Sequence, residues 1–514
     1  MQSAIGNLLD VSARRFGTKP ALVTMERTLT FAELDRLSTR FAAGLADLGV
    51  TPGDRVTLWL ENGWRWVVAY FGILRAGAVV NPANALLTPP EVRYMLDDCQ
   101  ARCAIVKSRD SEVLVGAEPV TWITSEASSS SGSHSFDALM ERGAASLHRW
   151  RAPPVGLADI CAIFYTSGTT GFPKGAVLRH ESVLMNLAMT SLMHGLHADD
   201  TIVTALPCAH VYGNVVLNTA MACGITLVLL PRLDERAILE SIERHRATIL
   251  EGVPSMYLSL LNIADLERFD LASLRLCTVG GQGMAVNRMQ EIEARLRCPL
   301  IELWGMTELA GLGTTHPYNG PRNLGSIGIP LPFSEVRITR PENAAHEVAA
   351  GEVGELLVRG PHVMNGYFQR PDETKAMIGP SGWLRTGDLV RRDARGYLYL
   401  VDRIKDIILS GGYTIYPAEI ERALAQYDEL SGAVAYPLED ALRGQVVKVT
   451  VVRRPGSSCT AEDVIAYCRG QLAAFKVPRA VEFTDRLPTG STGKVIRNAT
   501  RLTPPRATVY GKSS

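Results

Sequence analysis

Strand-like and helix-like segments alternate along most of the chain, and this alternation constrains the fold more than any other feature. Helical periodicity extends over Asp234–His245 and Asn287–Leu296. The strand-like apolar runs are Ala104–Val106, Ile160–Phe164, Thr226–Leu230 and Leu276–Val279. Such alternation predicts an α/β protein whose layered sheets are mostly parallel. After Asp388 the pattern changes to short strands and turns, and residues 391–403 predict a hairpin in which Gly396 follows the turn.

Chain length and charge limit the function classes. With 514 residues, 46% of them hydrophobic, the chain can bury a large core and must form more than one domain. Its 53 basic and 53 acidic residues balance, so no global field draws it to nucleic acid or an anionic membrane. The longest apolar stretch, Val215–Leu230, is interrupted by Asn218, Thr219 and Gly224. We therefore expect buried core there and no membrane span.

Cysteine usage and the N-terminus favour a cytoplasmic protein. The nine cysteines are scattered without a CxxC pair, and no second pair completes a zinc site with Cys99 and Cys103. We interpret them as buried thiols in a reducing cytoplasm. Residues 1–17 predict an amphipathic helix rather than a signal peptide. The composition of Ser125–Ser135 predicts a flexible surface loop.

The segment Tyr165–Val177, YTSGTTGFPKGAV, is suited to holding phosphate. Its small residues let backbone N–H groups approach an anion, its hydroxyls can donate hydrogen bonds, and Lys174 adds a mobile positive charge. It differs from a Walker loop because Lys174 precedes Gly175 rather than Ser or Thr. We expect it to bind a nucleoside triphosphate.

Four further motifs follow in order: LWGMTE (303–308), WLRTGDL (383–389), DRIKDIILSGGYTIYPAEIE (402–421) and PTGSTGK (488–494). Together with the first loop they resemble the acyl-adenylate-forming superfamily, in its acyl-CoA synthetase branch, over nearly the whole chain. The resemblance implies a large N-terminal domain, residues 1–401, a hinge at Asp402, and a small mobile C-terminal α+β domain, residues 402–514.

The resemblance also implies a nucleotide site. Asp388 would accept hydrogen bonds from both ribose hydroxyls, and Trp304, which stands where the family usually has Tyr, would stack on adenine. Tryptophan keeps a flat ring for stacking but lacks the tyrosine hydroxyl, so it cannot make a hydrogen bond that depends on that hydroxyl. The role of Gln282 stays open. The residues implied for ATP and AMP are Thr166, Ser167, Gly168, Thr169, Thr170, Gly171, Lys174, Gly281, Gln282, Gly283, Trp304, Gly305, Met306, Thr307, Asp388, Arg403 and Lys494.

The chemistry requires cations rather than a base. A carboxylate, with an ordinary pKa of about 4 to 5, is already ionised and needs no general base to attack phosphorus. Because it approaches a polyanion, catalysis consists of positioning and charge stabilisation. By resemblance, Lys494 contacts the attacking carboxylate and the α-phosphate, Thr307 contacts the α-phosphate, and Glu308 binds Mg²⁺. Lys494, Lys174, Thr307 and Glu308 are the predicted catalytic residues.

A second half-reaction with coenzyme A is implied by Gly411, Gly412 and Tyr413. A glycine pair lets a thin ligand pass close to the backbone, and in acyl-CoA synthetases this segment lines the pantetheine tunnel. For the acyl pocket we predict His210, Val211, Tyr212, Met284 and Leu309. His210 would gate access, although a satisfied core histidine is the alternative. Pro207–Asn214 contains no acidic residue, which disfavours an amino acid as the substrate. The pocket segments contain no arginine, which disfavours a dicarboxylate. An apolar acyl or aryl chain therefore fits best.

The sequence thus predicts an acid–CoA ligase that forms acyl-AMP and then acyl-CoA from a medium- or long-chain fatty acid or an aryl acid. The main alternative is an enzyme that loads its acyl group onto a carrier protein in trans. A homodimer is also compatible with the sequence. A noncatalytic scaffold is disfavoured by the intact site residues, and a luciferase-like oxygenase shares the first half-reaction.

Overall fold

The computed structural model describes residues 4–107, 120–126, 133–166, 173–410, 413–440, 443–487 and 509–510. Its helices are α1 (Leu8–Phe16), α2 (Phe31–Asp47), α3 (Trp64–Arg75), α4 (Pro89–Asp98), α6 (Phe136–Ser146), α7 (His180–His194), α8 (Val211–Cys223), α9 (Glu235–His245), α10 (Pro254–Leu261), α11 (Val286–Leu296), α12 (Pro371–Met377), α13 (Pro417–Leu424) and α14 (Ala461–Gln471). Short 3₁₀ turns are η1 (Ile5–Asn7), η2 (Leu266–Arg268), η3 (Thr307–Leu309), η4 (Ile404–Asp406) and η5 (Ala474–Lys476).

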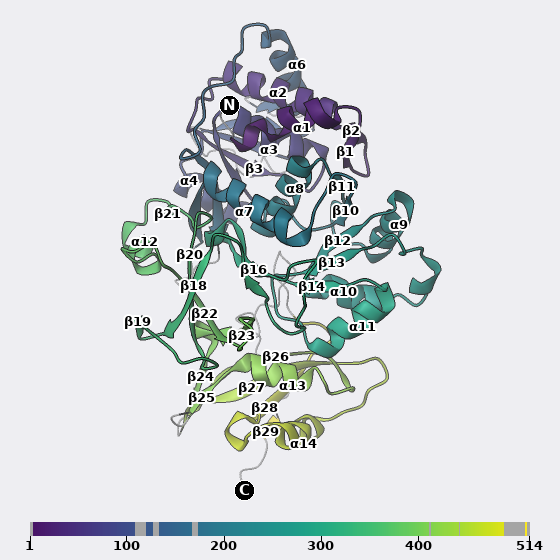
Figure 1. Ribbon diagram of the computed structural model, residues 1–514, viewed down its shortest axis with the longest axis vertical. Coiled ribbons are helices and arrows are strands. Elements are labelled where there is room, and N and C mark those ends of the chain that lie inside the picture. The colour runs from purple at the N-terminus through teal and green to yellow at the C-terminus, as the bar shows by residue number, and fades with distance from the viewer. Residues whose placement is uncertain are drawn as a thin grey trace.

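Two large sheets form the N-terminal part of the molecule (Figure 1). The seven-stranded sheet has the order β14 (Leu300–Glu302), β13 (Leu276–Val279), β12 (Ile249–Gly252), β10 (Thr201–Thr204), β11 (Thr226–Leu229), β1 (Pro20–Val23) and β2 (Thr28–Thr30), and only its β1–β2 pair is antiparallel. The eight-stranded sheet has the order β21 (Gly366–Tyr367), β9 (Lys174–Arg179), β8 (Ile160–Thr166), β4 (Val79–Pro82), β3 (Arg55–Trp59), β5 (Cys103–Val106), β6 (Thr121–Thr124) and β7 (Ser133–Ser135). In this second sheet the pairs β8–β9 and β9–β21 are antiparallel, and all other pairs, including β4–β8, are parallel.

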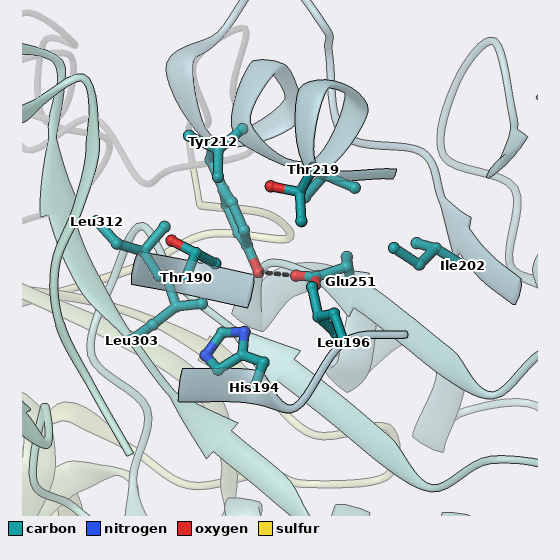
Figure 2. Close-up of a pocket in the computed structure, with 11 residues that line it drawn as sticks. Thr190, His194, Leu196, Ile202, Tyr212, Thr219, Glu251, Leu303 and Leu312 are labelled. Carbon is teal, nitrogen blue, oxygen red and sulfur yellow. Dashed lines mark hydrogen bonds between the residues drawn. The ribbon is translucent and has the colours of Figure 1, made fainter. Parts of the chain in front are cut away.

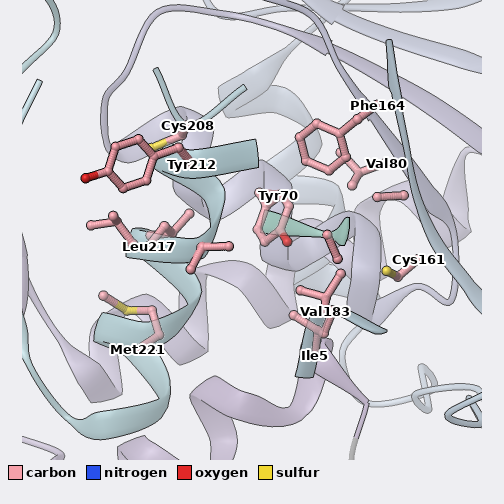
Figure 3. Packing of buried hydrophobic residues seen from close by; sticks show 14 of the residues in the cluster. Ile5, Tyr70, Val80, Cys161, Phe164, Val183, Cys208, Tyr212, Leu217 and Met221 are labelled. Carbon is pink, nitrogen blue, oxygen red and sulfur yellow. The ribbon is translucent and has the colours of Figure 1, made fainter. Parts of the chain in front are cut away.

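A shared core joins these two sheets. Figure 3 shows Phe164 of β8 packed near Tyr70 of α3, with Leu217 of α8 in the same cluster. The Tyr70 hydroxyl donates to Asn214 Oδ1 at 3.1 Å and accepts from Asn218 Nδ2 at 2.9 Å, so this buried hydroxyl is paired on both sides. The apolar stretch at Val215–Leu230 is buried core, as predicted.

Three smaller sheets complete the fold. One contains β15 (Trp304–Met306), β16 (Gly311–Thr315) and β17 (Ile329–Pro330), and a second contains β19 (Asn343–Glu347), β18 (Glu335–Arg340), β20 (Gly354–Arg359), β22 (Leu384–Arg392) and β23 (Leu398–Arg403). The third contains β25 (Tyr413–Ile415), β24 (Ile408–Ser410), β27 (Gly444–Arg453), β28 (Ala480–Phe483) and β29 (Val509–Tyr510), with β26 (Leu430–Asp440) paired to β27. This last sheet, with α13 and α14, lies at the end of the molecule opposite α2 and α6 (Figure 1).

The predicted α/β class is confirmed, and so are the strand and helix segments named from the sequence. The predicted hairpin is the β22–β23 pair, where Gly396 has a φ of +90°. One prediction was wrong in part. Ser133–Ser135, assigned to a flexible loop, forms β7, because its backbone pairs parallel with Trp122–Thr124 and Ser135 then caps α6. The rest of that serine-rich segment lies largely outside the described residues.

Candidate active site

The hairpin of β8 and β9 presents the phosphate-binding motif. Thr166 at the end of β8 and Lys174 at the start of β9 are paired across the two strands, so the described residues on either side of the predicted phosphate loop lie next to each other. Ser167, Gly168, Thr169, Thr170 and Gly171 lie outside the described residues. The hydroxyl of Tyr94, on α4, donates to the Pro173 carbonyl at 3.0 Å and holds the returning end of the loop.

Lys174 and Glu308 are brought together through Tyr367. The Lys174 ammonium lies 2.5 Å from Glu373 Oε2 and 5.6 Å from the centre of the Tyr367 ring. The Tyr367 hydroxyl donates to Glu308 Oε1 at 2.7 Å. Glu308 is buried, and burial raises the pKa of its carboxyl group. The sequence analysis missed Tyr367 because β21 joins β9 from almost two hundred residues away.

A buried amide fixes the turn that carries Glu308. Thr307, half-buried, opens the 3₁₀ turn η3 with Glu308, and Ala310 follows it with a φ of +53°. Asn186 of α7 donates from Nδ2 to the carbonyl oxygens of Leu309 at 2.9 Å and Leu312 at 2.8 Å. A helix of the main core therefore positions the metal-binding candidate.

Replacing Asn186 with alanine is expected to lower the free energy of unfolding by about 2 kcal/mol or more, because two buried carbonyls lose their donor. Thermal and urea denaturation would measure this loss. Asn319→Ala, at an exposed position, is the matched control and should melt as the parent does. Equal melts of the Asn186 variant and the parent would contradict the inferred role.

Trp304 and Asp388 form one buried pair. Trp304 Nε1 donates to Asp388 Oδ2 at 2.7 Å, and Arg403 Nε lies 3.2 Å from Asp388 Oδ1. Asp388 and Arg403 are directly paired across β22 and β23. The tryptophan thus carries a hydrogen bond of its own to the predicted ribose ligand. Gly305 and Met306 continue β15 between Trp304 and Thr307.

The turn of Gly281, Gln282 and Gly283 follows β13 and Gly280. A Cβ on the preceding Gly280 would lie 2.3 Å from Leu303 Cδ1 and 3.3 Å from Tyr212 Cε1, so this backbone packs closely against both side chains. Gly281 has a φ of +93°. Beside the turn, burial raises the pKa of Glu302 to about 8, a feature that the sequence analysis did not find.

Of the predicted acyl-pocket residues, only Tyr212 lines a cavity within the described structure. Tyr212 lines a cavity beside α8 (Figure 2). His210 precedes that helix, and its Nδ1 accepts from the backbone N–H of Tyr212 at 3.2 Å, as a capping residue does. Val211, Met284 and Leu309 are buried and do not line this cavity within the described structure.

Comparison with known proteins agrees with this geometry. Residues 9–368 match the family described as AMP-binding enzyme, and residues 419–494 match the AMP-binding enzyme C-terminal domain. The chain belongs to the AMP-binding enzyme family.

Individual relatives cover almost the whole of this AMP-binding enzyme. A long-chain-fatty-acid–CoA ligase of Escherichia coli O157:H7 is 34% identical, over 96% of this chain and 93% of its own. A feruloyl-CoA synthase of an Amycolatopsis species is 35% identical, over 92% of this chain and 93% of its own. The crystal structure of the anthranilate CoA ligase AuaEII with anthranoyl-AMP superimposes with a TM-score of 0.90 at 26% identity and covers 97% of each chain.

The residues predicted to bind coenzyme A are only partly described. Tyr413, 56% exposed at the start of β25, stacks on Phe475 with 4.4 Å between ring centres. Gly411, Gly412 and Lys494 lie outside the described residues. Within the part that is described, no helix combines the length and the apolar character needed to cross a bilayer.

Proposed function

We propose that this enzyme is an ATP-dependent acid–CoA ligase. A carboxylate attacks the α-phosphorus of ATP to give acyl-AMP and pyrophosphate, and the thiol of CoA then displaces AMP to give the acyl-CoA. ATP and CoA as substrates fit the family. The observation that carries the proposal is the convergence of Lys174, Glu308 and Asp388 from three distant segments: Lys174 and Glu308 both lie beside Tyr367, and Asp388 accepts from Trp304 in the strand that leads to Glu308.

Within the described residues, Lys174 and Arg403 are the positively charged side chains that we propose stabilise the negative charge of ATP. Lys174 at the returning end of the loop would meet the phosphates, and its salt bridge with Glu373 holds it there until ATP arrives. Arg403 is exposed beside Asp388 and would reach ribose or phosphate. We assign the attacking carboxylate and the α-phosphate to Lys494, on the sequence motif alone.

A magnesium ion fits the donor groups beside η3. Glu308 supplies a carboxylate oxygen and Thr307 a hydroxyl, and Mg²⁺ takes few protein ligands because it keeps several waters. The described residues contain no cluster of three or more His, Cys, Asp or Glu side chains, so a site of one carboxylate is the one we propose. When bound, the ion would neutralise phosphate charge.

For Asp388→Asn we expect a rise of about tenfold or more in the apparent KM for ATP. The amide can still accept from Trp304, but the charged partner of Arg403 and of the ribose hydroxyls is lost. The test is an ATP titration of pyrophosphate release. Glu335→Gln, which removes a charge from the exposed pair with Arg359 on the same sheet, is the control. An unchanged KM for ATP would exclude the ribose role.

We keep the domain boundary at Asp402 as part of the proposal. Asp402 is buried, and its Oδ2 accepts from the backbone N–H of Ala418 at the start of α13 at 2.8 Å. The last strand of the large part is thus tied to the first helix of the small part. A rotation of the small domain about Asp402 would remove Lys494 from the active site and bring Tyr413 to it. We therefore place the two half-reactions in one active site.

The substrate class that we propose is a fatty acid or an aryl carboxylic acid. The relatives act, by name, on long-chain fatty acids, feruloyl groups and anthranilate. Nine free cysteines, eight of them buried, favour a reducing compartment such as the cytoplasm.

A panel of carboxylic acids, scored for pyrophosphate release with and without CoA, tests the function. A ligase should release pyrophosphate in an acid-dependent manner and form a thioester only with CoA present. If a carrier protein accepts the acyl group and free CoA does not, the alternative of carrier loading in trans is correct. A homodimer, also proposed, would be detected by light scattering.

A further inference from the structure

Asp98, the last residue of α4, lies outside every motif that the sequence analysis singled out. Its side chain is 10% exposed, and each of its two carboxylate oxygens accepts a hydrogen bond. Oδ2 accepts from the Tyr165 hydroxyl at 2.6 Å, and Oδ1 accepts from Arg370 Nη2 at 2.5 Å. One carboxylate therefore joins the end of β8 to the residue that precedes α12, and α4 and α12 lie beside each other on one side of the molecule (Figure 1).

Through Tyr165, this carboxylate supports the backbone beside Lys174. Tyr165 is paired with Gly175 across β8 and β9, and Gly175 directly follows Lys174. A Cβ on Gly175 would lie 3.3 Å from Tyr165 Cζ, so the ring lies close to this backbone. Burial raises the pKa of the Tyr165 hydroxyl, so the hydroxyl stays protonated and donates to Asp98. The hydrogen bond therefore holds the ring against the strand that begins with Lys174.

Through Arg370, the same carboxylate supports the side chain of Lys174. Arg370 is the N-cap residue of α12, and its carbonyl oxygen accepts from the backbone N–H of Thr374 at 3.0 Å. Glu373, in the first turn of that helix, lies 2.5 Å from Lys174 Nζ. The ion pair of Arg370 with Asp98 thus fixes the start of the helix that provides the partner of the ammonium group.

A second residue of α4 contacts the other side of Lys174. Tyr94, one helical turn before Asp98, donates to the carbonyl oxygen of Pro173, which directly precedes the lysine. The rings of Tyr94 and Tyr165 meet edge-on, with 6.3 Å between their centres. The last turn of α4 therefore supports Lys174 at the backbone on both sides and, through α12, at the ammonium group.

We propose that Asp98 is a positioning residue for adenylation, which fixes Lys174 where this lysine meets the pyrophosphate part of ATP. A misplacement of about 1 Å can cost a positioned group about a hundredfold in rate, so the support of a phosphate-binding cation matters. Acyl-AMP has no β- or γ-phosphate, so the same support is not needed once the adenylate has formed. This role rests on the proposed ligase function and deepens it.

Asp98→Ala in the full-length enzyme tests this role. We expect the apparent KM for ATP in pyrophosphate release to rise about tenfold, because the hydrogen bonds of a charged group are lost. The KM for the acid and the rate of thioester formation from supplied acyl-AMP should stay within about twofold of the parent. Asp98→Asn, which keeps an oxygen for Tyr165 but not the charge for Arg370, should have an intermediate KM for ATP.

Asp97→Ala is the matched control. Asp97 is the neighbour of Asp98 on the same helix, but its side chain is 59% exposed and pairs with Arg93 on the helix surface. The control should leave the KM for ATP and both half-reactions at the parent values. A rise in the KM for ATP equal to that of Asp98→Ala would show a general effect of removing a charge from α4 and would overturn the proposed role.

A double-variant cycle with Lys174→Ala decides whether Asp98 acts through the lysine. The Kd for ATP is measured by equilibrium binding, so slow variants remain measurable. When residue 174 is already alanine, Asp98→Ala should weaken ATP binding by no more than about twofold. A tenfold loss in both backgrounds, or an equal loss of both half-reactions in Asp98→Ala, would indicate a purely structural role and overturn the inference. If Asp98→Ala does not fold, Tyr165→Phe, which keeps the ring, should show the same dependence on Lys174 with a loss of about threefold.

The outcomes separate this inference from the proposed function. If the parent releases pyrophosphate in an acid-dependent manner and Asp98→Ala has an unchanged KM for ATP, the inference is wrong and the ligase function stands. A lack of pyrophosphate release by the parent with every acid of the panel would overturn both.

Discussion

Replacing Lys494 with alanine is expected to lower the rate of acyl-AMP formation by about a hundredfold or more, equivalent to about 2.7 kcal/mol of transition-state stabilisation. The reason is charge: an anionic carboxylate must approach an anionic α-phosphate, and we propose that the lysine of the motif PTGSTGK acts between them. Formation of the thioester from supplied acyl-AMP should be spared, because the carboxylate has already been activated. Single-turnover assays of each half-reaction would measure the two effects separately.

Lys375→Ala, at an exposed position on α12, is the matched control for removal of one positive charge. It should leave both half-reactions at the parent rate. Equal losses of both half-reactions in the Lys494 variant would reject the assignment of two alternating faces to one site. A loss confined to adenylation would support the hinge at Asp402.

Local pairing explains why the sequence could indicate which residues of the candidate nucleotide site lie together. Thr166 and Lys174 belong to adjacent strands joined by a short loop, and Asp388 and Arg403 lie across one hairpin. In both cases a turn motif and the strands beside it fix the register, so neighbours in sequence become neighbours in space. The alternation of apolar runs and helical periods likewise determined the α/β class.

The residues that sequence reasoning missed are joined by long-range contacts. Tyr367 reaches Glu308 only because β21 pairs with the edge of β9, and a two-residue strand leaves little periodic signal. Thr219 follows Asn218 on α8, and Glu251 lies among apolar residues of β12; both line the cavity beside Tyr212. The sequence alone could not place these two residues at one cavity, because the helix and the strand that carry them are brought together only by tertiary packing.

Glu308→Gln is expected to lower acid-dependent pyrophosphate release by about a hundredfold or more without disturbing the fold. Glutamine has nearly the same shape, and its oxygen can still accept from the Tyr367 hydroxyl, so the buried hydrogen bond survives. The lost element is the negative charge, which the proposed Mg²⁺ site requires. Pyrophosphate release measured over a range of Mg²⁺ concentrations, together with a thermal melt, would test this prediction.

Tyr367→Phe is the complementary variant, because it removes the hydrogen bond to Glu308 but keeps the charge and the ring beside Lys174. If Glu308 serves as a charged ligand, the phenylalanine variant should lose about tenfold at most and keep the Mg²⁺ dependence of the parent, whereas the glutamine variant should need much more Mg²⁺. If Glu308 serves only as the acceptor for Tyr367, the order reverses: the glutamine variant would retain parent activity and the phenylalanine variant would be the damaged one. The ratio of the two rates therefore decides between a ligand and a structural acceptor, even if both variants lose some stability.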